Sequence, residues 1–563
     1  MRSFWRLTKA PLWGLFAVLL AGQVAAAKPP SAAIASAHPL ATAAGMAILQ
    51  SGGNAFDAAV TVSAVLAVVE PYGSGIGGGG FWLLHRAEDG KQVMVDGREK
   101  APMAATRDMY LGDDGEPVKG LSLNGPLAAG IPGEPAALVH IAENYGRLPL
   151  QVTLAPAIRL AREGFLVDEE YRKMAGFRLE VLRKDPAAAS QFLVDNEIPA
   201  FGQLLKQPDL ADTLQAIADR GFDGFYRGEV ARRLVQGTRA AGGIWTEQDL
   251  ADYRVVEREP VVGQYAGYRV VSAAPPSSGG VILIQMLNML EQLRFGGYDS
   301  ANKVHLLTEV MRRAYRDRAL YLGDTDFVAV PVQQLIDPGY AKQQIRDIDV
   351  HKASASEPMG EAVAKGEDTT HFSILDTQGN RVAATLSVNY PFGACFVPPG
   401  TGVLLNNEMD DFSIKPGTPN AYGLVGNEAN AIAPGKRMLS SMSPTFLERD
   451  DQVAILGTPG GSRIISMLLI GILQAASGSP VEHWVGRARF HHQYLPDVIQ
   501  FEPGALSPQT REILQRKGHQ LKELKDGYGN MQAILWDRQN GRVSAASDPR
   551  GIGAAYVSGV TAE

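Results

Sequence analysis

Hydrophobic and polar positions along the chain follow helical and extended patterns in turn, without a fixed-period repeat or a low-complexity tract. Residues 41–50 have helical spacing and end at Gly52 and Gly53, and Asn54 can cap a second apolar helix that runs toward Val69. Between residues 136 and 241, Leu, Ala and Ile recur at three- and four-residue intervals with charges between them. We expect these helices to form a covering layer rather than to carry the functional site.

A run of glycines separates the second predicted helix from a strand. Gly77 to Gly80 directly precede the apolar residues 81–84 (FWLL), which are typical of a buried strand. So many glycines indicate that backbone segments pack closely together. A phosphate-binding loop is the alternative, but the Lys-Ser/Thr pair of a P-loop is absent and the element order does not match a dinucleotide-binding motif.

Residues 346–367 are rich in charge and poor in apolar side chains, which predicts an exposed, mobile segment. Directly afterwards, residues 369–376 and 381–388 alternate as two strands of a hairpin. Cleavage before Thr369 would give this residue a free α-amino group, whose pKa of about 7.7–8.0 suits a general base near neutral pH. Nucleophile and base would then share one residue, although Thr-rich strands also occur for packing reasons alone.

A strand, a glycine turn and an apolar helix follow one another over residues 453–457, 458–461 and 462–476. The consecutive amides of Gly460 and Gly461 at a helix N-terminus can point into a common space and stabilise an oxyanion. A tight turn without a ligand accounts for these residues equally well.

The composition describes a chain that can bury a large core. Of its 563 residues 45% are hydrophobic and 20% are charged, which excludes a disordered or collagen-like chain. The net charge of −7 gives no general attraction to nucleic acid or to an anionic membrane. The single cysteine, Cys395, excludes an intramolecular disulfide and a thiolate metal site, and it is expected to be a small buried apolar residue.

The N-terminus has the features of a secretory signal peptide at residues 1–27. Basic residues precede an apolar run at 12–21, and Ala25 and Ala27 have the spacing of a signal-peptidase site, so the mature chain would begin at Lys28. The predicted location is therefore periplasmic or secreted, and an uncleaved anchor is the alternative. Gln23 stands where a lipoprotein signal would need Cys, and no later run of 18 uncharged apolar residues follows.

Several further motifs resemble those of the γ-glutamyltransferases, which are N-terminal-nucleophile hydrolases, over nearly all of the expected mature chain. After position 368 the matching motifs are residues 369–371 (TTH), 404–412 (LLNNEMDDF), 439–445 (LSSMSPT) and 459–463 (PGGSR). Before it they are residues 96–99 (DGRE) with 101–102 (AP), 130–133 (GIPG), 145–149 (YGRLP) and 275–280 (PPSSGG), and 547–550 (SDPR) lies near the C-terminus. The resemblance implies an α+β fold, a four-layer αββα sandwich with two mainly antiparallel sheets between helical layers.

The resemblance also implies the catalytic residues. Thr369 would be both the autoprocessing residue and the nucleophile, and Ser387 would hydrogen-bond to it. Family members more often have Thr at the position of Ser387; the hydroxyl is retained, but the lost methyl group could loosen the rotamer. The backbone amides of Gly460 and Gly461 would form the oxyanion hole.

The substrate-binding residues implied by the resemblance form two groups. Those for the α-carboxylate are Arg98, Ser440 and Ser441, and those for the α-ammonium are Asn389, Glu408 and Asp411. A γ-glutamyl group carries both charges on one carbon, so its site needs a guanidinium that faces acidic residues from another direction. Without the resemblance, residues 408–411 would be interpreted as a solvated acidic turn, and a calcium loop would need further oxygen ligands at fixed spacing.

The segment from Ser413 to Arg437, which contains Tyr422, is long for a plain connection. It resembles the lid loop that covers the glutamyl pocket in many family members. Such a loop would restrict water and help an acyl-enzyme persist until an amine arrives. A variable surface excursion is the alternative.

Together these features predict an autoprocessed enzyme without a cofactor or a metal. Cleavage between Asp368 and Thr369 would give a large subunit, 28–368, and a small subunit, 369–563, in one globule. The expected substrates are glutathione and other γ-glutamyl compounds, with water, amino acids or peptides as acceptors; nucleic acid and membrane are not expected partners. The alternatives are a cephalosporin or glutaryl acylase of the same superfamily, which has no use for an α-ammonium site, and an inactive secreted scaffold.

Overall fold

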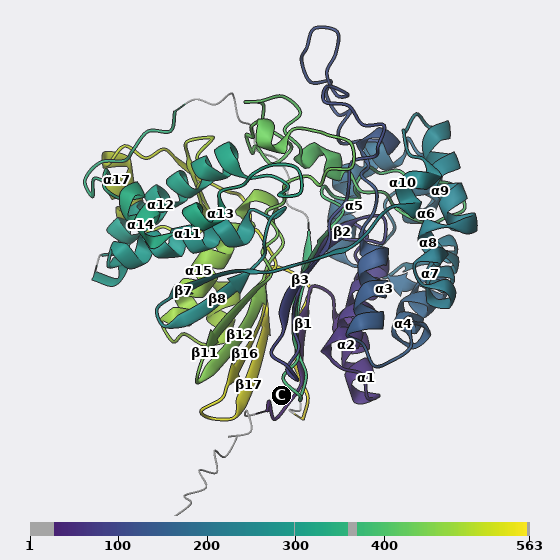
Figure 1. The fold of residues 1–563 in the computed structure, drawn as a ribbon, viewed down its shortest axis with the longest axis horizontal. Helices are drawn as coiled ribbons and strands as arrows, with labels where there is room; N and C mark the ends of the chain where they lie inside the picture. Colours follow the sequence, from purple (N-terminus) through teal and green to yellow (C-terminus); the bar gives the residue numbers. More distant parts are fainter. Residues whose placement is uncertain (1–27, 298, 358–368, 560–563) are drawn as a thin grey trace, which may run out of the picture.

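The computed structural model describes residues 28–297, 299–357 and 369–559. Two stacked antiparallel sheets lie between two layers of helices, with α1–α10 outside one sheet and α11–α17 outside the other (Figure 1). The expected four-layer αββα arrangement is therefore confirmed.

The first sheet has seven strands and carries the expected hairpin. In spatial order its strands are β18 (Ala554–Val557), β1 (Ala33–Ser36), β9 (Thr370–Leu375), β10 (Arg381–Ser387), β2 (Gly79–His85), β3 (Gln92–Gly97) and β6 (Val256–Arg258). All neighbouring pairs are antiparallel, and Thr385 of β10 lies opposite His371 of β9.

The second sheet has six strands and faces the first. In spatial order they are β17 (Arg542–Ser547), β16 (Gln532–Asp537), β12 (Gln452–Gly457), β11 (Thr445–Arg449), β8 (Tyr268–Ser272) and β7 (Val261–Tyr265), again antiparallel throughout. Two small sheets accompany them, β13 (Phe490–His491) with β14 (Ile499–Phe501) and β15 (Leu521–Glu523), and β4 (Phe165–Leu166) with β5 (Leu204–Leu205).

The helices are divided by chain position. Those outside the seven-stranded sheet are α1 (Pro39–Gln50), α2 (Ala55–Val69), α3 (Glu134–Asn144), α4 (Leu150–Glu163), α5 (Glu169–Leu182), α6 (Pro186–Phe192), α7 (Pro208–Arg220), α8 (Asp223–Tyr226), α9 (Gly228–Ala240) and α10 (Glu247–Ala251). Those outside the six-stranded sheet are α11 (Gly279–Gln292), α12 (Ser300–Tyr321), α13 (Val332–Leu335), α14 (Pro338–Gln344), α15 (Ile464–Ala476), α16 (Val481–Gly486) and α17 (Pro508–Arg516).

Alternating side chains of the seven-stranded sheet pack into two different hydrophobic cores. On β2, Trp82 and Leu84 pack with the helices α1–α5, whereas Phe81 and Leu83 belong to the core that includes the facing sheet. This alternation follows from the two-residue period of a strand and explains why β2 is apolar throughout. The predicted start of α2 is also confirmed, because Asn54 and Asp57 form a reciprocal capping box.

The glycines from Gly77 to Gly80 allow close backbone packing, as the sequence analysis predicted. A Cβ at Gly77 would lie 1.9 Å from the Leu404 carbonyl oxygen, and one at Gly78 would lie 2.1 Å from that of Ser387. Only glycine permits the backbones to approach so closely. Cys395 is buried, as expected, and its thiol accepts a hydrogen bond from Arg178.

The charged segment after α14 is fastened to the surface over its described part. The amide of Ala353 donates to the Lys517 carbonyl, and the amide of Ser356 donates to Asp497. Residues 358–368, which include Asp368, and the expected signal peptide at 1–27 lie outside the described residues.

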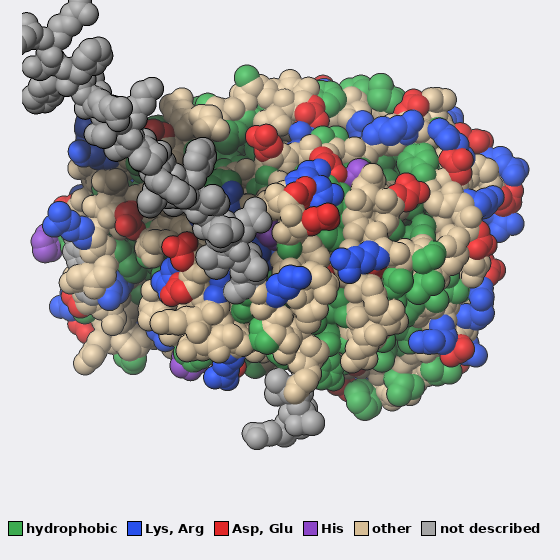
Figure 2. Space-filling model, turned by 60° about the horizontal axis from the view of Figure 1, so that its bottom comes forward, with side chains coloured by type: hydrophobic (Ala, Val, Ile, Leu, Met, Phe, Trp, Pro, Cys, Tyr) green, Lys and Arg blue, Asp and Glu red, His purple; other side chains and the backbone are tan. Residues whose placement is uncertain are grey.

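Charged side chains are spread over the face shown in Figure 2, where Lys and Arg alternate with Asp and Glu in small groups. Within the part of the chain that the structure describes, no helix combines the length and the apolar character needed to cross a bilayer.

Candidate active site

Thr369 directly precedes β9, an interior strand of the seven-stranded sheet, and is only 8% exposed. It lines two cavities. One has a volume of about 620 Å³ and the other of about 20 Å³, roughly the space of one water molecule. Thr369 therefore lies where a large chamber meets a small, nearly closed one.

The two candidate oxyanion glycines lie at the same junction. Gly460 lines the large cavity and Gly461 the small one, with φ values of +133° and +54°. These conformations favour glycine, and a Cβ at Gly461 would lie 2.4 Å from the ring of Tyr422. The predicted order of strand, glycine turn and helix is confirmed by β12, a short 3₁₀ turn (Gly461–Arg463) and α15.

The small cavity gathers residues that are far apart in the sequence. Of the residues singled out in the sequence, its walls contain Thr369, Ser387, Asn389, Glu408, Asp411, Tyr422, Ser440, Ser441 and Gly461. Arg98, which directly follows β3 and is fully buried, reaches this cavity through ion pairs with two of them. Every described residue expected at the site is thus in the cavity wall, paired with it, or, like Gly460, at its junction with the large cavity.

The charges of this cavity differ from the expected arrangement in one respect. Arg98 does not face the acidic residues across a gap but pairs with them directly: its guanidinium donates to Glu408, and its Nη2 lies 2.6 Å from Asp411 Oδ2. Glu408 and Asp410 are buried, which excludes the solvated acidic turn as an interpretation. The candidate ligands for the two substrate charges therefore bind each other.

Burial controls the protonation of the carboxyl groups around Arg98. It raises the pKa of Glu99 to about 8, although Arg98 opposes the change. Burial, together with repulsion from Glu99 and Asp411, raises the pKa of Glu408 well above its usual range. The pKa of Asp411 is also raised by burial, against the opposing effects of Arg98 and Arg318. One guanidinium is thus shared by several carboxyl groups that are not all ionised together.

The two serines are held in a defined orientation. The Ser440 hydroxyl accepts from the Met442 amide at 3.0 Å, and its carbonyl accepts from the amide of Ser278 at 2.8 Å. The Ser441 hydroxyl accepts from Arg318 Nη2 at 3.2 Å, and Arg318 Nε donates to the Ser278 hydroxyl at 3.0 Å.

The sequence analysis missed Arg318. It lies near the end of α12, is 5% exposed, and brings a second guanidinium toward Ser441 and Asp411. Its helix contains several other buried charges, among them Glu309, Arg312 and Asp317, so the residue pattern alone does not single out Arg318.

Tyr422 lies against the junction of the two cavities. Its hydroxyl donates to the Asn389 carbonyl, and its ring covers Gly461. The loop around it is fastened to the acidic turn, since the Ala421 amide donates to Asp410 and Asn420 Nδ2 donates to Asp411. The lid interpretation therefore fits better than an unattached surface excursion.

Asn389 and Ser387 are linked through the backbone. The Asn389 amide nitrogen donates to the Ser387 hydroxyl at 2.7 Å. Asn389 Nδ2 donates to the Asn407 carbonyl at 2.9 Å, which leaves the side-chain oxygen of Asn389 as the atom able to accept a hydrogen bond from a substrate.

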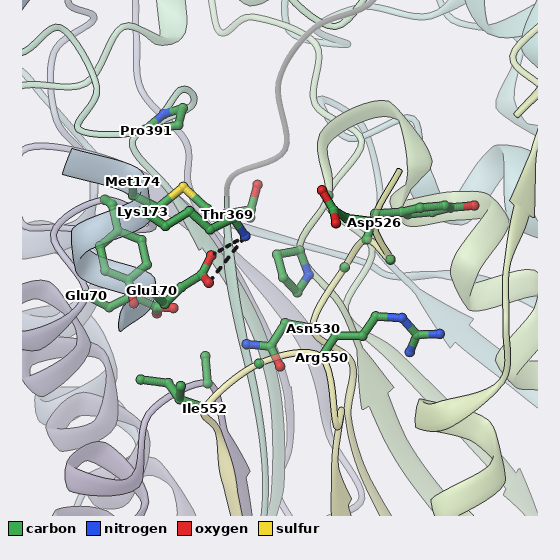
Figure 3. A pocket seen from close by; sticks show the side chains of 18 of the residues that line it. Glu70, Glu170, Lys173, Met174, Thr369, Pro391, Asp526, Asn530, Arg550 and Ile552 are labelled. Atoms are coloured by element: carbon green, nitrogen blue, oxygen red, sulfur yellow. Dashed lines mark hydrogen bonds and ion pairs between the residues drawn. The ribbon is translucent and has the colours of Figure 1, made fainter. Parts of the chain in front are cut away.

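The large cavity includes side chains from both helical and loop segments. Glu70 and Glu170 lie on one side of it in Figure 3, and Asn530 and Arg550 lie on the other. Glu170, Lys173, Met174 and Phe177 belong to α5, so the expectation that this helical layer would only cover the core was wrong. Glu70 was also missed in the sequence, where it is a single charge after an apolar helix.

His371 belongs to the motif at residues 369–371, but its side chain contributes to packing. Its ring packs between the sheets, where a Cβ at Gly457 would lie 2.1 Å from it, and its Nδ1 lies 2.8 Å from the Thr385 hydroxyl. Burial lowers the pKa of His371 to about 3, so the imidazole is neutral at physiological pH.

Among the described residues, His305, Glu309 and His519 have the spacing of a metal site. Their donor atoms already have partners, because His305 Nδ1 lies 2.8 Å from His519 Nε2 and Glu309 accepts from Arg313 at 2.7 Å. None of the three lines either cavity beside Thr369.

Comparison with known proteins gives a consistent result. The profile of the family described as Gamma-glutamyltranspeptidase matches residues 41–558. The chain is 43% identical over 527 residues to the glutathione hydrolase proenzyme of Escherichia coli K12, which covers 92% of this chain and 90% of the relative.

Two solved structures are also similar. A cephalosporin acylase from Bacillus halodurans superposes with a TM-score of 0.81 at 28% identity, covering 94% of this chain and 96% of that one. The γ-glutamyltranspeptidase of Helicobacter pylori is 42% identical with a TM-score of 0.55, covering 57% of this chain and 92% of that one.

Proposed function

The chain belongs to the γ-glutamyltranspeptidase family, and we propose that it cleaves the γ-glutamyl amide of glutathione and related compounds through an ester on Thr369. The γ-glutamyl group is then transferred to water or to an amino acid or peptide. The observation that carries this proposal is the position of Thr369 between two cavities, with the candidate oxyanion glycines at their junction.

The small cavity suits the γ-glutamyl group because it combines a guanidinium, serine hydroxyls and carboxylates. The substrate α-carboxylate would bind Arg98, Ser440 and Ser441, and the α-ammonium would bind Asn389, Glu408 and Asp411. Binding then exchanges the internal pair of Arg98 and Asp411 for two pairs with the substrate. Because the cavity holds only about 20 Å³, less than a γ-glutamyl group occupies, we expect the Tyr422 loop to move when the substrate enters.

Formation of the ester needs only groups at this junction. The free α-amino group of Thr369 accepts the proton of its own hydroxyl as Oγ attacks the γ-amide carbonyl. The amides of Gly460 and Gly461 stabilise the oxyanion, and the proton passes to the leaving amine as the C–N bond breaks. The resulting ester reacts with water, or with an amine in its neutral form, by the reverse sequence of proton transfers.

We propose further that the precursor, exported by a signal peptide at residues 1–27, cleaves itself between Asp368 and Thr369. The strand order supports one globule after cleavage: β1 of the large piece lies between β18 and β9 of the small piece, and β10 of the small piece pairs with β2 of the large one. The two pieces would therefore share both sheets.

Mass spectrometry of the purified protein tests the processing. Chains of 341 and 195 residues, beginning at Lys28 and Thr369, are expected. Thr369→Ala should leave one uncut chain that does not hydrolyse a chromogenic γ-glutamyl anilide. If pure Thr369→Ala were still cleaved at the same bond, Thr369 would not be the processing residue.

An acylase acting on glutaryl side chains is the second candidate, because the Bacillus halodurans cephalosporin acylase shares the fold over most of both chains. A glutaryl donor has no α-ammonium and would leave the Asp411 carboxylate without a cationic substrate partner. The buried Glu408 and the partly buried Asp411 therefore favour γ-glutamyl donors.

A further inference from the structure

Glu70 is a buried carboxylic acid that shares the large cavity with Thr369. It follows the last residue of α2, a helix in which every residue is buried, and is itself 6% exposed. Its Oε2 atom is shielded from solvent and has no hydrogen bond of ordinary geometry among the described residues, and the Thr370 hydroxyl is the polar side chain that acts on the carboxyl group. A carboxyl group in this state destabilises the fold, and a catalytic or binding role is one explanation for its presence.

Among the residues that the structure describes, the charged groups around Glu70 give it no cationic partner. Asp168 and Glu170 of the neighbouring α5 segment add further negative charge. Lys173 is held by Glu170 at 3.1 Å, and Arg550 across the cavity is held by Glu502 at 2.7 Å. This side of the cavity is therefore suited to receive a positively charged group from a ligand.

The proposed reaction brings such a group to the large cavity. If the γ-glutamyl group occupies the small cavity, the leaving amine and any incoming amine must lie on the other side of Thr369. An acceptor amino acid or peptide is mostly an ammonium ion at neutral pH, and an ammonium has no lone pair with which to attack an ester. It must lose a proton inside the site.

We propose that Glu70 binds the ammonium group of the acceptor and removes its proton, so that Glu70 is the general base for transfer to amines but not for hydrolysis. This inference rests on the proposed γ-glutamyl transfer. It deepens that function by assigning acceptor recognition to a residue outside the glutamyl pocket.

The acidity of Glu70 supports this role. Burial raises its pKa to about 8, with a smaller increase from Asp168 and Glu170 and a partial offset by the Thr370 hydroxyl. The α-amino group of a peptide has a pKa of about 7.7–8.0, so the proton transfer between them is nearly balanced. An ammonium beside the carboxyl group also favours its ionised form, which prepares the base when the acceptor binds.

The proton transfers balance. The Glu70 carboxylate takes one proton from the ammonium, and the free amine attacks the ester carbonyl to form the C–N bond. The tetrahedral intermediate collapses as the bond to Thr369 Oγ breaks, and the second amine proton passes through the Thr369 α-amino group to that oxygen. Glu70 then releases its proton to solvent. Water arrives neutral and does not need the first step.

The test compares two acceptors in the mature Glu70→Gln enzyme at pH 7. Glycylglycine arrives as an ammonium, whereas hydroxylamine is uncharged at this pH. With a γ-glutamyl anilide as donor, transfer to glycylglycine should fall at least about tenfold, as expected when a general base is lost. Hydrolysis and transfer to hydroxylamine should change less than about twofold.

Asp526→Asn is the matched control, because it removes a carboxylate charge from an exposed residue of the same cavity that is not among the charged groups acting on Glu70. Its partition between glycylglycine and water should match that of the wild type. An equal loss with both acceptors in Glu70→Gln, or an unchanged partition, would overturn the inference.

If Glu70→Gln does not mature, Glu70→Ala provides the test, and added formate should restore transfer to glycylglycine without raising hydrolysis. Failure of formate to do so would count against Glu70 as the base. Absence of γ-glutamyl hydrolysis in the wild type would instead refute the proposed function, while wild-type hydrolysis without any transfer would refute only the role of Glu70.

Discussion

Replacement of Asp411 by Asn separates recognition of the substrate from the chemistry of Thr369. Asp411 Oδ2 lies 2.6 Å from Arg98 Nη2, and Asn420 holds its other oxygen at 3.1 Å. Asparagine has nearly the same shape and can keep the contact with Asn420, but it carries no charge. The oxyanion amides of Gly460 and Gly461 are unaffected, so cleavage at Asp368-Thr369 should continue.

The expected change in kcat/KM differs between the two kinds of donor. Loss of a charge-assisted hydrogen bond to the substrate ammonium costs about 1.5–3 kcal/mol, which is roughly a ten- to hundredfold loss in kcat/KM for γ-glutamyl donors. A glutaryl donor carries the carboxylate but no ammonium, so it loses nothing at Asp411. It also gains, because Arg98 no longer has to leave Asp411 before it binds the donor carboxylate.

The assay measures kcat/KM for γ-glutamyl and glutaryl anilides on the mature wild-type and Asp411→Asn enzymes. The ratio of the two constants should shift by at least about tenfold toward the glutaryl donor. A denaturing gel that shows both subunits serves as the control for processing. If both donors lost activity equally, Asp411 would act only through the structure of the pocket, and the acylase alternative would gain support.

Three further predictions concern groups around the junction. Tyr422→Ala should admit water and lower the ratio of transfer to hydrolysis, measured with a fixed acceptor concentration, because the ring no longer covers Gly461. Arg318→Gln should raise KM for γ-glutamyl donors about tenfold with less effect on kcat, since Ser441 loses its donor; equal loss in kcat would contradict this. Glu70→Gln should stabilise the protein increasingly from pH 5 to pH 8. The wild-type Glu70 has a folded-state pKa of about 8 against 4.5 unfolded, so the unfolded state holds fewer protons and wild-type stability falls as pH rises. The gain in the free energy of unfolding, measured by thermal unfolding, is on the order of 4 kcal/mol at most. A gain that did not depend on pH would refute the raised pKa of Glu70.

Local sequence patterns predicted the elements that local forces determine. The capping box at Asn54, the hairpin after Thr369 and the glycine turn at Gly460 each depend on residues a few positions apart, and each was predicted correctly. The close packing of Gly77–Gly80 was also predictable, because consecutive glycines have no side chains that would keep neighbouring backbones apart.

Contacts between segments that are distant in the sequence were harder to predict. Arg98 meets Asp411 across more than three hundred residues, and the pattern of neither segment indicates that the two pair directly. Arg318 and Glu70 were missed for the same reason. Each is one charge on or beside a largely buried helix, and only the folded chain brings the first to Ser441 and the second to the cavity of Thr369.

The pairing of Arg98 with Asp411 has a consequence for specificity. Opening the pocket separates the buried Arg98 from the partly buried Asp411, and leaving a buried charge without a partner costs several kcal/mol. A donor that brings only a carboxylate satisfies Arg98 but leaves Asp411 unpaired, while one that brings only an ammonium does the reverse. A zwitterionic donor satisfies both at once. Selection for the γ-glutamyl group therefore arises as much from the cost that other donors impose on the open pocket as from the contacts that the correct donor makes.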